Sequence, residues 1–230
     1  EDVISAPSAE SIYEIPLNFE KDNMGKVICE KLKIKSRKKD FKAWKDFVDK
    51  IKKAAETVKI GIIGKYFSTG DFVLADSYIS VIEAIKHSAY FHGKKPIIEW
   101  LNAEKYDGGG AEEYLKKLNE YDGIIVPGGF GDRGVEGKIS AIKYCRENKI
   151  PILGICYGMQ LMVVEFARHI AGLKGAHTTE VNPKTFYNVI DILPEQKEKM
   201  AKNNYGGSMR LGAYDANIKK GTIAYASYGK

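Results

Sequence analysis

The feature that most constrains the fold is an alternation, between Val58 and Gly172, of short apolar runs with longer amphipathic segments. Strands of about 4–8 residues that alternate with helices of about 10–15 residues are typical of βαβ units, whose parallel sheet is covered on both faces. The sequence therefore predicts an α/β fold: a three-layer, open, mostly parallel sheet with helices on both faces. The expected strands are VKIGIIG, PIIEWL, YDGIIVPGG and PILGIC, and the expected helices cover about 76–92, 111–119, 135–148 and 159–172.

The segments that flank this region give weaker signals. Residues 1–35 hold short apolar pieces broken by Pro16 and Gly25, which show no sustained period and are typical of the end of a preceding domain. A helix is predicted from about Asp40 to Glu56, because its apolar residues recur at helical spacing. After Gly175, the runs VIDIL, SMRLGAYDANI and TIAYASY are expected to form later strands, antiparallel and separated by long loops.

The net charge of +6 is unevenly distributed along the chain. Between Lys31 and Lys59 there are 12 basic and 4 acidic residues, so this stretch holds the whole excess of positive charge. A nucleic-acid-binding protein more often spreads basic and aromatic residues over a folded face. We therefore interpret the basic stretch as a linker and expect no nucleic-acid partner.

Other class-level features exclude several alternatives. No apolar run approaches the ~18 residues of a membrane-spanning helix, and the acidic, polar start EDVISAPSAE is not a signal peptide. The three cysteines form no CxxC pair, which favours a reducing compartment, and we expect a cytoplasmic protein. The four histidines show no ligand-like spacing, so no metal site is predicted.

The sharpest chemical signal is Cys156, which stands between a buried-type strand and a helix with glycines at −2 and +2. This G-x-C-x-G pattern has the form of a nucleophile elbow with Cys in place of Ser. A tight turn of this kind leaves no room for Cβ atoms on either side, which explains Gly154 and Gly158. The helix N-terminus beside the sulfur favours the thiolate. Without the flanking glycines, a buried structural cysteine would be the better interpretation. We interpret Cys145 and Cys29 as structural.

A glycine-rich segment after the preceding strand has two interpretations. Gly129, Gly131 and Gly134 match G-x-G-x-x-G, the dinucleotide fingerprint, but the next strand ends without the acid that this fingerprint requires. Alternatively, backbone N–H groups near Gly128 and Gly129 form an oxyanion hole, with the N–H of Tyr157 as the other donor.

Together, PGGFGDRG and LGICYGMQ resemble the class I, Cys-dependent glutamine amidotransferases. VEGKISAIKYCREN, EFARHIAGLKGAHTTE and GGSMRLGAY are similar to the glutaminase domain of the CTP synthase family, and SAESIYEIP resembles the end of its synthetase domain. The resemblance implies three parts: residues 1–35 as a remnant of the synthetase domain, 36–57 as a basic linker with an amphipathic helix, and 58–230 as a glutaminase domain truncated at its C-terminal end.

The resemblance also implies roles for single residues. Cys156 would be the nucleophile that attacks the side-chain carbonyl of glutamine and forms a γ-glutamyl thioester. A carboxylate suits the ammonium group of the substrate and a guanidinium its α-carboxylate. The implied glutamine-contacting residues are Gly129, Tyr157, Gly158, Met159, Gln160, Glu180 and Arg210.

For the whole enzyme, the resemblance implies that ammonia reaches the synthetase domain and aminates UTP to CTP, with ATP and Mg²⁺ as cofactors there. The glutaminase domain itself needs no cofactor. GTP is implied as an allosteric activator, and a dimer or tetramer as the assembly. The segment between Tyr66 and Ser77 is longer than we expect for the family, which puts GTP contacts there in doubt.

A nucleophile of this kind needs a general base, usually a His oriented by a carboxylate. In the family these form a His-x-Glu pair after the strand that resembles IAYASYG, and no such pair occurs before Lys230. We therefore expect little glutaminase activity from residues 1–230 alone. The alternatives are another class I amidotransferase subunit or α/β cysteine hydrolase, or an inert nucleotide-binding module.

Overall fold

A computed structural model describes residues 3–36, 39–64, 68–69, 72–73, 78–129, 131–194, 197 and 215–228. The chain divides into two compact units, Glu1–Ile190 and Asp191–Lys230, which we describe separately. Arg210 and most of the segment between Tyr66 and Ser77 lie outside the described residues, so the predictions made for them stay predictions.

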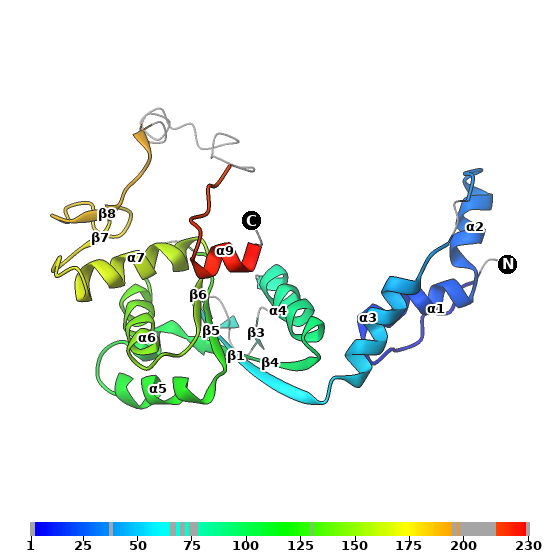
Figure 1. The fold of residues 1–230 in the computed structure, drawn as a ribbon, viewed down its shortest axis with the longest axis horizontal. Helices are drawn as coiled ribbons and strands as arrows, with labels where there is room; N and C mark the ends of the chain where they lie inside the picture. Colours follow the sequence, from blue (N-terminus) through cyan, green and yellow to red (C-terminus); the bar gives the residue numbers. More distant parts are fainter. Residues whose placement is uncertain are drawn as a thin grey trace. The chain divides into compact units, whose positions relative to one another are not determined.

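A four-stranded parallel sheet in the order β4-β1-β5-β6 forms the centre of the first unit (Figure 1). Each expected strand is present, with slightly different ends. The strands are β1 (Glu56–Gly64), β4 (Lys94–Asn102), β5 (Gly123–Val126) and β6 (Ile152–Gly154). In an open parallel sheet, ligands bind at the carboxyl ends of the strands, near the place where the strand order reverses. Here the order reverses at β1, which has β4 on one side and β5 on the other.

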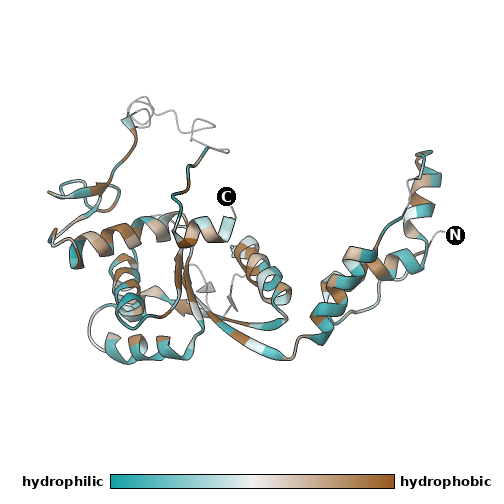
Figure 2. Cartoon of the chain, viewed as in Figure 1, coloured by the Kyte–Doolittle hydropathy of each residue, from teal (hydrophilic) through white to brown (hydrophobic). Residues whose placement is uncertain are grey.

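Helices cover both faces of the sheet, as predicted from the alternation. Adjacent residues of β1 point to opposite faces: Ile62 packs with Ile85 of α4, and Ile63 belongs to the larger core under α5, α6 and α7. Figure 2 shows hydrophobic central strands beside a largely hydrophilic α5. The helices are α4 (Ile79–Phe91), α5 (Ala111–Lys117), α6 (Val135–Glu147) and α7 (Tyr157–His169), with short 3-10 turns η3 (Ala103–Tyr106) and η4 (Leu118–Glu120).

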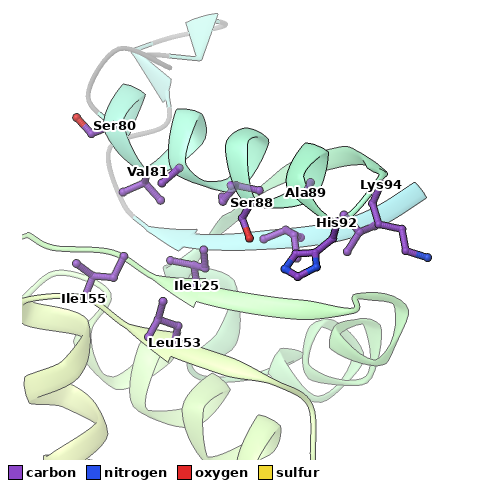
Figure 3. Close-up of a pocket in the computed structure, with 13 residues that line it drawn as sticks. Ser80, Val81, Ser88, Ala89, His92, Lys94, Ile125, Leu153 and Ile155 are labelled. Carbon is purple, nitrogen blue, oxygen red and sulfur yellow. The ribbon is translucent and has the colours of Figure 1, made fainter. Parts of the chain in front are cut away.

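An apolar pocket of about 670 Å³ lies between α4 and the sheet. Side chains of α4 line one wall, and Ile125, Leu153 and Ile155 project from β5 and from β6 and the residue after it (Figure 3). Cys156 is not among its lining residues. The pocket therefore lies where α4 does not fully cover the sheet, and it does not include Cys156.

The N-terminal segment is helical, although residues 1–35 show no sustained period in the sequence. It contains η1 (Ile12–Glu14), α1 (Ile15–Lys21) and α2 (Met24–Lys31). Pro16 separates the apolar pieces of the sequence but does not interrupt a helix. It lies in the first turn of α1, where a proline costs no hydrogen bond.

The predicted amphipathic helix is α3 (Lys42–Lys53), which is shorter than expected. Its Trp44 donates from Nε1 to the carbonyl of Tyr13 at 2.9 Å. Tyr13 is buried, and its hydroxyl donates to Glu83 of α4. These contacts hold the N-terminal segment and α3 against α4.

The later strands differ from expectation. VIDIL is represented by β8 (Asn188–Ile190), which pairs with β7 (His177–Thr178) in parallel and not antiparallel. TIAYASY forms a helix, α9 (Ile223–Tyr228), because Thr222 Oγ1 accepts from the backbone N–H of Tyr225 at 3.1 Å and caps its first turn. A small antiparallel pair, β2 (Ser68–Thr69) and β3 (Phe72–Val73), falls in the long segment before α4. Within the described part of the chain, no helix has the length and apolar character needed to cross a bilayer.

Candidate active site

Cys156 occupies the strand–helix turn that the sequence pattern predicts. It follows β6, caps the N-terminus of α7, and is exposed. Its backbone has φ 54° and ψ −111°, a conformation that L-residues rarely adopt. A strained turn of this kind is the defining property of a nucleophile elbow, because it raises the side chain above the sheet edge.

The two flanking glycines are required by close backbone contacts. A Cβ on Gly158 would lie 1.9 Å from the carbonyl oxygen of Val126, at the end of the neighbouring strand. A Cβ on Gly154 would lie 2.6 Å from the backbone nitrogen of Met159. The steric reason given for the G-x-C-x-G pattern is therefore confirmed, and α7 packs directly on the end of β5.

The glycine-rich loop lies beside the cysteine, because β5 and β6 are neighbours and end together. We define this loop by its described glycines, Gly128, Gly129, Gly131 and Gly134. Gly128 lies close to Cys156: an added Cβ on Gly128 would be in van der Waals contact with it, 3.4 Å from its Cβ and 3.7 Å from its Sγ. The first N–H groups of α7 have no partner within the helix, and they start at the residue after the thiol. The arrangement suits an oxyanion hole, whereas the dinucleotide interpretation gains no support from it.

Tyr157 and Glu180 meet at the loop from different parts of the chain. The Tyr157 hydroxyl donates to the carbonyl of Gly131 at 3.0 Å, and Glu180 Oε1 accepts from the N–H of Gly131 at 3.0 Å. Burial raises the pKa of Tyr157 to about 12, with smaller contributions from the negative charges of Glu180 and Asp132. The phenol therefore stays protonated at neutral pH and can donate the hydrogen bond to Gly131.

The predicted glutamine-contacting residues are only partly brought together. Gly129 lies in the loop, and Tyr157, Gly158, Met159 and Gln160 form the first turn of α7 after Cys156. Met159 is exposed, whereas the side chain of Tyr157 is buried and faces the loop. Arg210 lies outside the described residues, so its role stays a prediction.

Sequence analysis did not identify one buried residue near the loop, Lys138. Lys138 is 1% exposed, and its Nζ lies 5.6 Å from the centre of the Tyr157 ring. The available signal was its position in α6 between Val135 and Ile142, on a stripe of otherwise apolar buried residues. A lysine inside such a stripe indicates a buried positive charge.

The other two cysteines agree with a structural interpretation. Cys145 is fully buried in the core, and burial raises its pKa to about 12. Cys29 is half-buried in α2. Among the residues that the structure describes, His, Cys, Asp and Glu side chains form no group of three that could hold a metal ion.

The histidines make contacts away from the thiol. His169 Nδ1 lies 3.3 Å from Glu165 Oε1, and His177 Nε2 lies 3.5 Å from Glu136 Oε1. His87 packs on the rings of Tyr13 and Phe47. These contacts give no support for a histidine of this set as the general base.

His177 should make stability depend on pH. Burial, followed by the charge of Arg168, lowers its pKa below the ordinary 6.5, against a smaller opposing effect of Glu136. Below pH 6.5 the unfolded chain therefore binds a proton at His177 that the folded protein does not bind. The free energy of unfolding is unaffected by this difference above pH 6.5, and it decreases as the pH falls from 6.5 towards the pKa of His177 in the folded protein. We expect His177→Gln to weaken the fall in the free energy of unfolding between about pH 7 and about pH 5, measured by urea titration. His92→Gln, on the surface, is the control for removing one histidine; an unchanged slope in His177→Gln would contradict the prediction.

Comparisons with known proteins agree with this geometry. A family model described as glutamine amidotransferase class-I matches residues 73–228. The CTP synthase of Methanocaldococcus jannaschii is 50% identical over 233 residues, which cover 100% of this chain and 42% of that protein. The CTP synthase of Geobacillus kaustophilus is 45% identical, with 99% of this chain and 41% of that protein covered. The chain thus spans about two fifths of the length of these relatives.

A solved structure supports the same assignment. The Trypanosoma brucei CTPS glutaminase domain with bound acivicin is 36% identical, with a TM-score of 0.55 over 60% of this chain and 51% of that one. The resemblance and the fold class predicted from the motifs are both confirmed, whereas the division into three parts and the roles of single residues stay predictions. The chain therefore belongs to the class I glutamine amidotransferase family, and throughout its length it is similar to CTP synthases.

Proposed function

We propose that this chain carries the glutamine-hydrolysing site of a CTP synthase. The observation that carries the proposal is the strained, exposed turn at Cys156, with Gly128 of the glycine-rich loop close to its side chain. Family membership supports glutamine as the substrate, because the matching family is the class I glutamine amidotransferases. Neither observation alone would separate this site from other cysteine hydrolases.

In the proposed reaction, the Cys156 thiolate attacks the side-chain carbonyl carbon of glutamine. The oxyanion that forms is held by backbone N–H groups of the glycine-rich loop and of Tyr157. Collapse of this intermediate re-forms the C=O bond and breaks the C–N bond, which leaves the γ-glutamyl thioester. The nitrogen takes a proton from the protonated form of the general base, acting as a general acid, and leaves as ammonia. Water then cleaves the thioester, which yields glutamate and returns the free thiol.

Substrate binding is proposed to use charge complementarity. Glu180 lies at the loop with one carboxylate oxygen on the N–H of Gly131, which leaves the other oxygen for the ammonium group of glutamine. Arg210 is proposed for the α-carboxylate. The contacts of His87, His169 and His177 are with groups other than Cys156 and do not support any of the three as the base.

The names of the relatives support a wider proposal for the whole protein. Ammonia from this site would aminate UTP to CTP in a synthetase domain that uses ATP and Mg²⁺. GTP would act as an activator, and the assembly would be a dimer or tetramer. Three free cysteines, none in a disulfide, suit the reducing cytoplasm.

The proposal is tested by covalent labelling of the purified protein with acivicin, followed by mass spectrometry. We expect one adduct, on Cys156, that forms more slowly when excess glutamine is present and is absent from Cys156→Ala. Cys145 should stay unmodified, because it is buried. Cys29→Ser is the matched control and should label like the parent. An adduct that glutamine does not slow, or the absence of any adduct on Cys156, would overturn the proposal; retention of a nucleotide on purification would then favour a binding module.

A further inference from the structure

Both backbone hydrogen-bonding groups of Gly131 are held by side chains from distant parts of the chain. Its carbonyl accepts from the hydroxyl of Tyr157, which is 26 residues away, and its N–H donates to Glu180, which is 49 residues away. Gly131 has φ +76°, a left-handed conformation that is open to glycine. The two side chains therefore fix the direction of the loop at this residue.

The side chain of Tyr157 is itself held firmly. It is 2% exposed, and Lys138 Nζ lies 5.6 Å from the ring centre, in range of a cation–π contact. Lys138 is buried as well. A buried ring packed in this way has few alternative rotamers, so its hydroxyl presents a fixed donor to the loop.

The same residue is covalently joined to the nucleophile. Tyr157 directly follows Cys156, and Gly128 of the loop lies so close to Cys156 that an added Cβ would be 3.7 Å from its Sγ. The hydroxyl of Tyr157 thus joins the nucleophile turn to the loop that faces it, at a point three residues beyond Gly128. Donors for an oxyanion must be held in place before the reaction, because reorganising them during it costs rate.

We propose that the hydroxyl of Tyr157 is a positioning group, which keeps the N–H groups of the glycine-rich loop aligned with the Cys156 thiol through Gly131. The inference rests on the proposed glutaminase function and deepens it. It also changes the role predicted for Tyr157: its backbone N–H faces the reaction, whereas its side chain acts on the loop and does not contact glutamine.

The test compares two reagents on the purified protein and on Tyr157→Phe, which removes the hydroxyl and keeps the ring. A chloromethyl ketone analogue of glutamine has a carbonyl oxygen that uses the oxyanion donors. Iodoacetamide alkylates a thiol by direct displacement and does not use them. We expect Tyr157→Phe to lower the maximal rate of Cys156 alkylation by the chloroketone about tenfold, less than the loss of a whole oxyanion donor. The chloroketone concentration at half-maximal rate, and the rate with iodoacetamide, should stay the same.

Two further variants separate positioning from general structural damage. Tyr144→Phe is the matched control and should behave like the parent, because the hydroxyl of Tyr144, on α6, accepts from the side chain of Asn119, in η4. Tyr157→4-aminophenylalanine retains a donor at the ring tip and should restore most of the chloroketone rate.

The outcomes distinguish this inference from the proposed function. If the parent protein is not alkylated by the chloroketone in a manner that glutamine slows, the proposed function fails. If the parent is alkylated in that manner and Tyr157→Phe reacts at the same rate, the positioning inference fails and the proposed function stands. A parallel fall in the rates of both reagents would show a purely structural role for the hydroxyl and would also overturn the inference.

Discussion

Gly158→Ala should cost about 3 kcal/mol or more of the free energy of unfolding, because the added methyl group meets backbone that has nowhere to move. A Cβ at this position would lie 1.9 Å from the carbonyl oxygen of Val126 and 2.7 Å from its carbonyl carbon. Relief requires α7 to separate from the end of β5. A loss of this size is a large part of the roughly 5–15 kcal/mol that stabilises a typical domain. The measurement is the urea midpoint, together with labelling of Cys156 by acivicin, which should also be lost.

Gly25→Ala is the matched control for this prediction. Gly25 is the second residue of α2, as Gly158 is the second residue of α7. A Cβ on Gly25 would meet only the carboxylate oxygen of Glu20 at 3.3 Å, the end of a flexible side chain. The helix propensity of alanine favours this change by up to about 1 kcal/mol. If the two variants unfolded at similar urea concentrations, the steric account of the elbow would be wrong.

Arg146→Met should destabilise the protein by about 2–3 kcal/mol, because it leaves the buried carboxylate of Glu165 without its main partner. Glu165 is 1% exposed and accepts from Arg146 Nη2 at 2.8 Å and from Nε at 3.1 Å. The expected cost is at the low end for a broken buried pair, because the side chain of Arg146 is 31% exposed and its own desolvation is incomplete. Thermal and urea unfolding of the purified variant measure the effect.

An exposed ion pair on α5 is the control for the loss of a cation. Lys116 Nζ lies 2.7 Å from Glu112 Oε1, but the two side chains are 66% and 81% exposed. Solvent screens such a pair, so Lys116→Met should unfold like the parent. Equal effects of the two substitutions would mean that burial of Glu165 does not decide the cost.

The elements that sequence analysis predicted well are those with long, regular patterns. The four strands and four helices between Glu56 and His169 follow the alternation closely, because a parallel sheet with two covered faces requires apolar strands and amphipathic helices. The failures are short segments. Pro16 separates two apolar pieces in the sequence, yet a proline is compatible with the first turn of a helix, and α1 begins there. A short apolar run such as TIAYASY fits a strand or a helix equally well by periodicity, and the cap at Thr222 favours the helix.

Sequence analysis could predict the parts of the candidate site whose residues are neighbours in the sequence. The strained turn at Cys156 is encoded in five consecutive residues, because the steric demands of the turn fall on its immediate neighbours. The buried Lys138 was not predicted, since a lysine in a helix usually faces solvent. The direction of the Tyr157 side chain was not predictable either, because its partner lies 26 residues away.

The sequence alone determined the parallel α/β architecture, the family and the position of the thiol, because periodicity and turn geometry act over a few residues. The tertiary structure decided which groups surround that thiol. Gly128 lies close to it because β5 and β6 end side by side, and Gly131 is held by Tyr157 and Glu180 because the fold brings three distant segments to one sheet edge. Contacts of this kind depend on how whole elements pack, and no local pattern of residues specifies them.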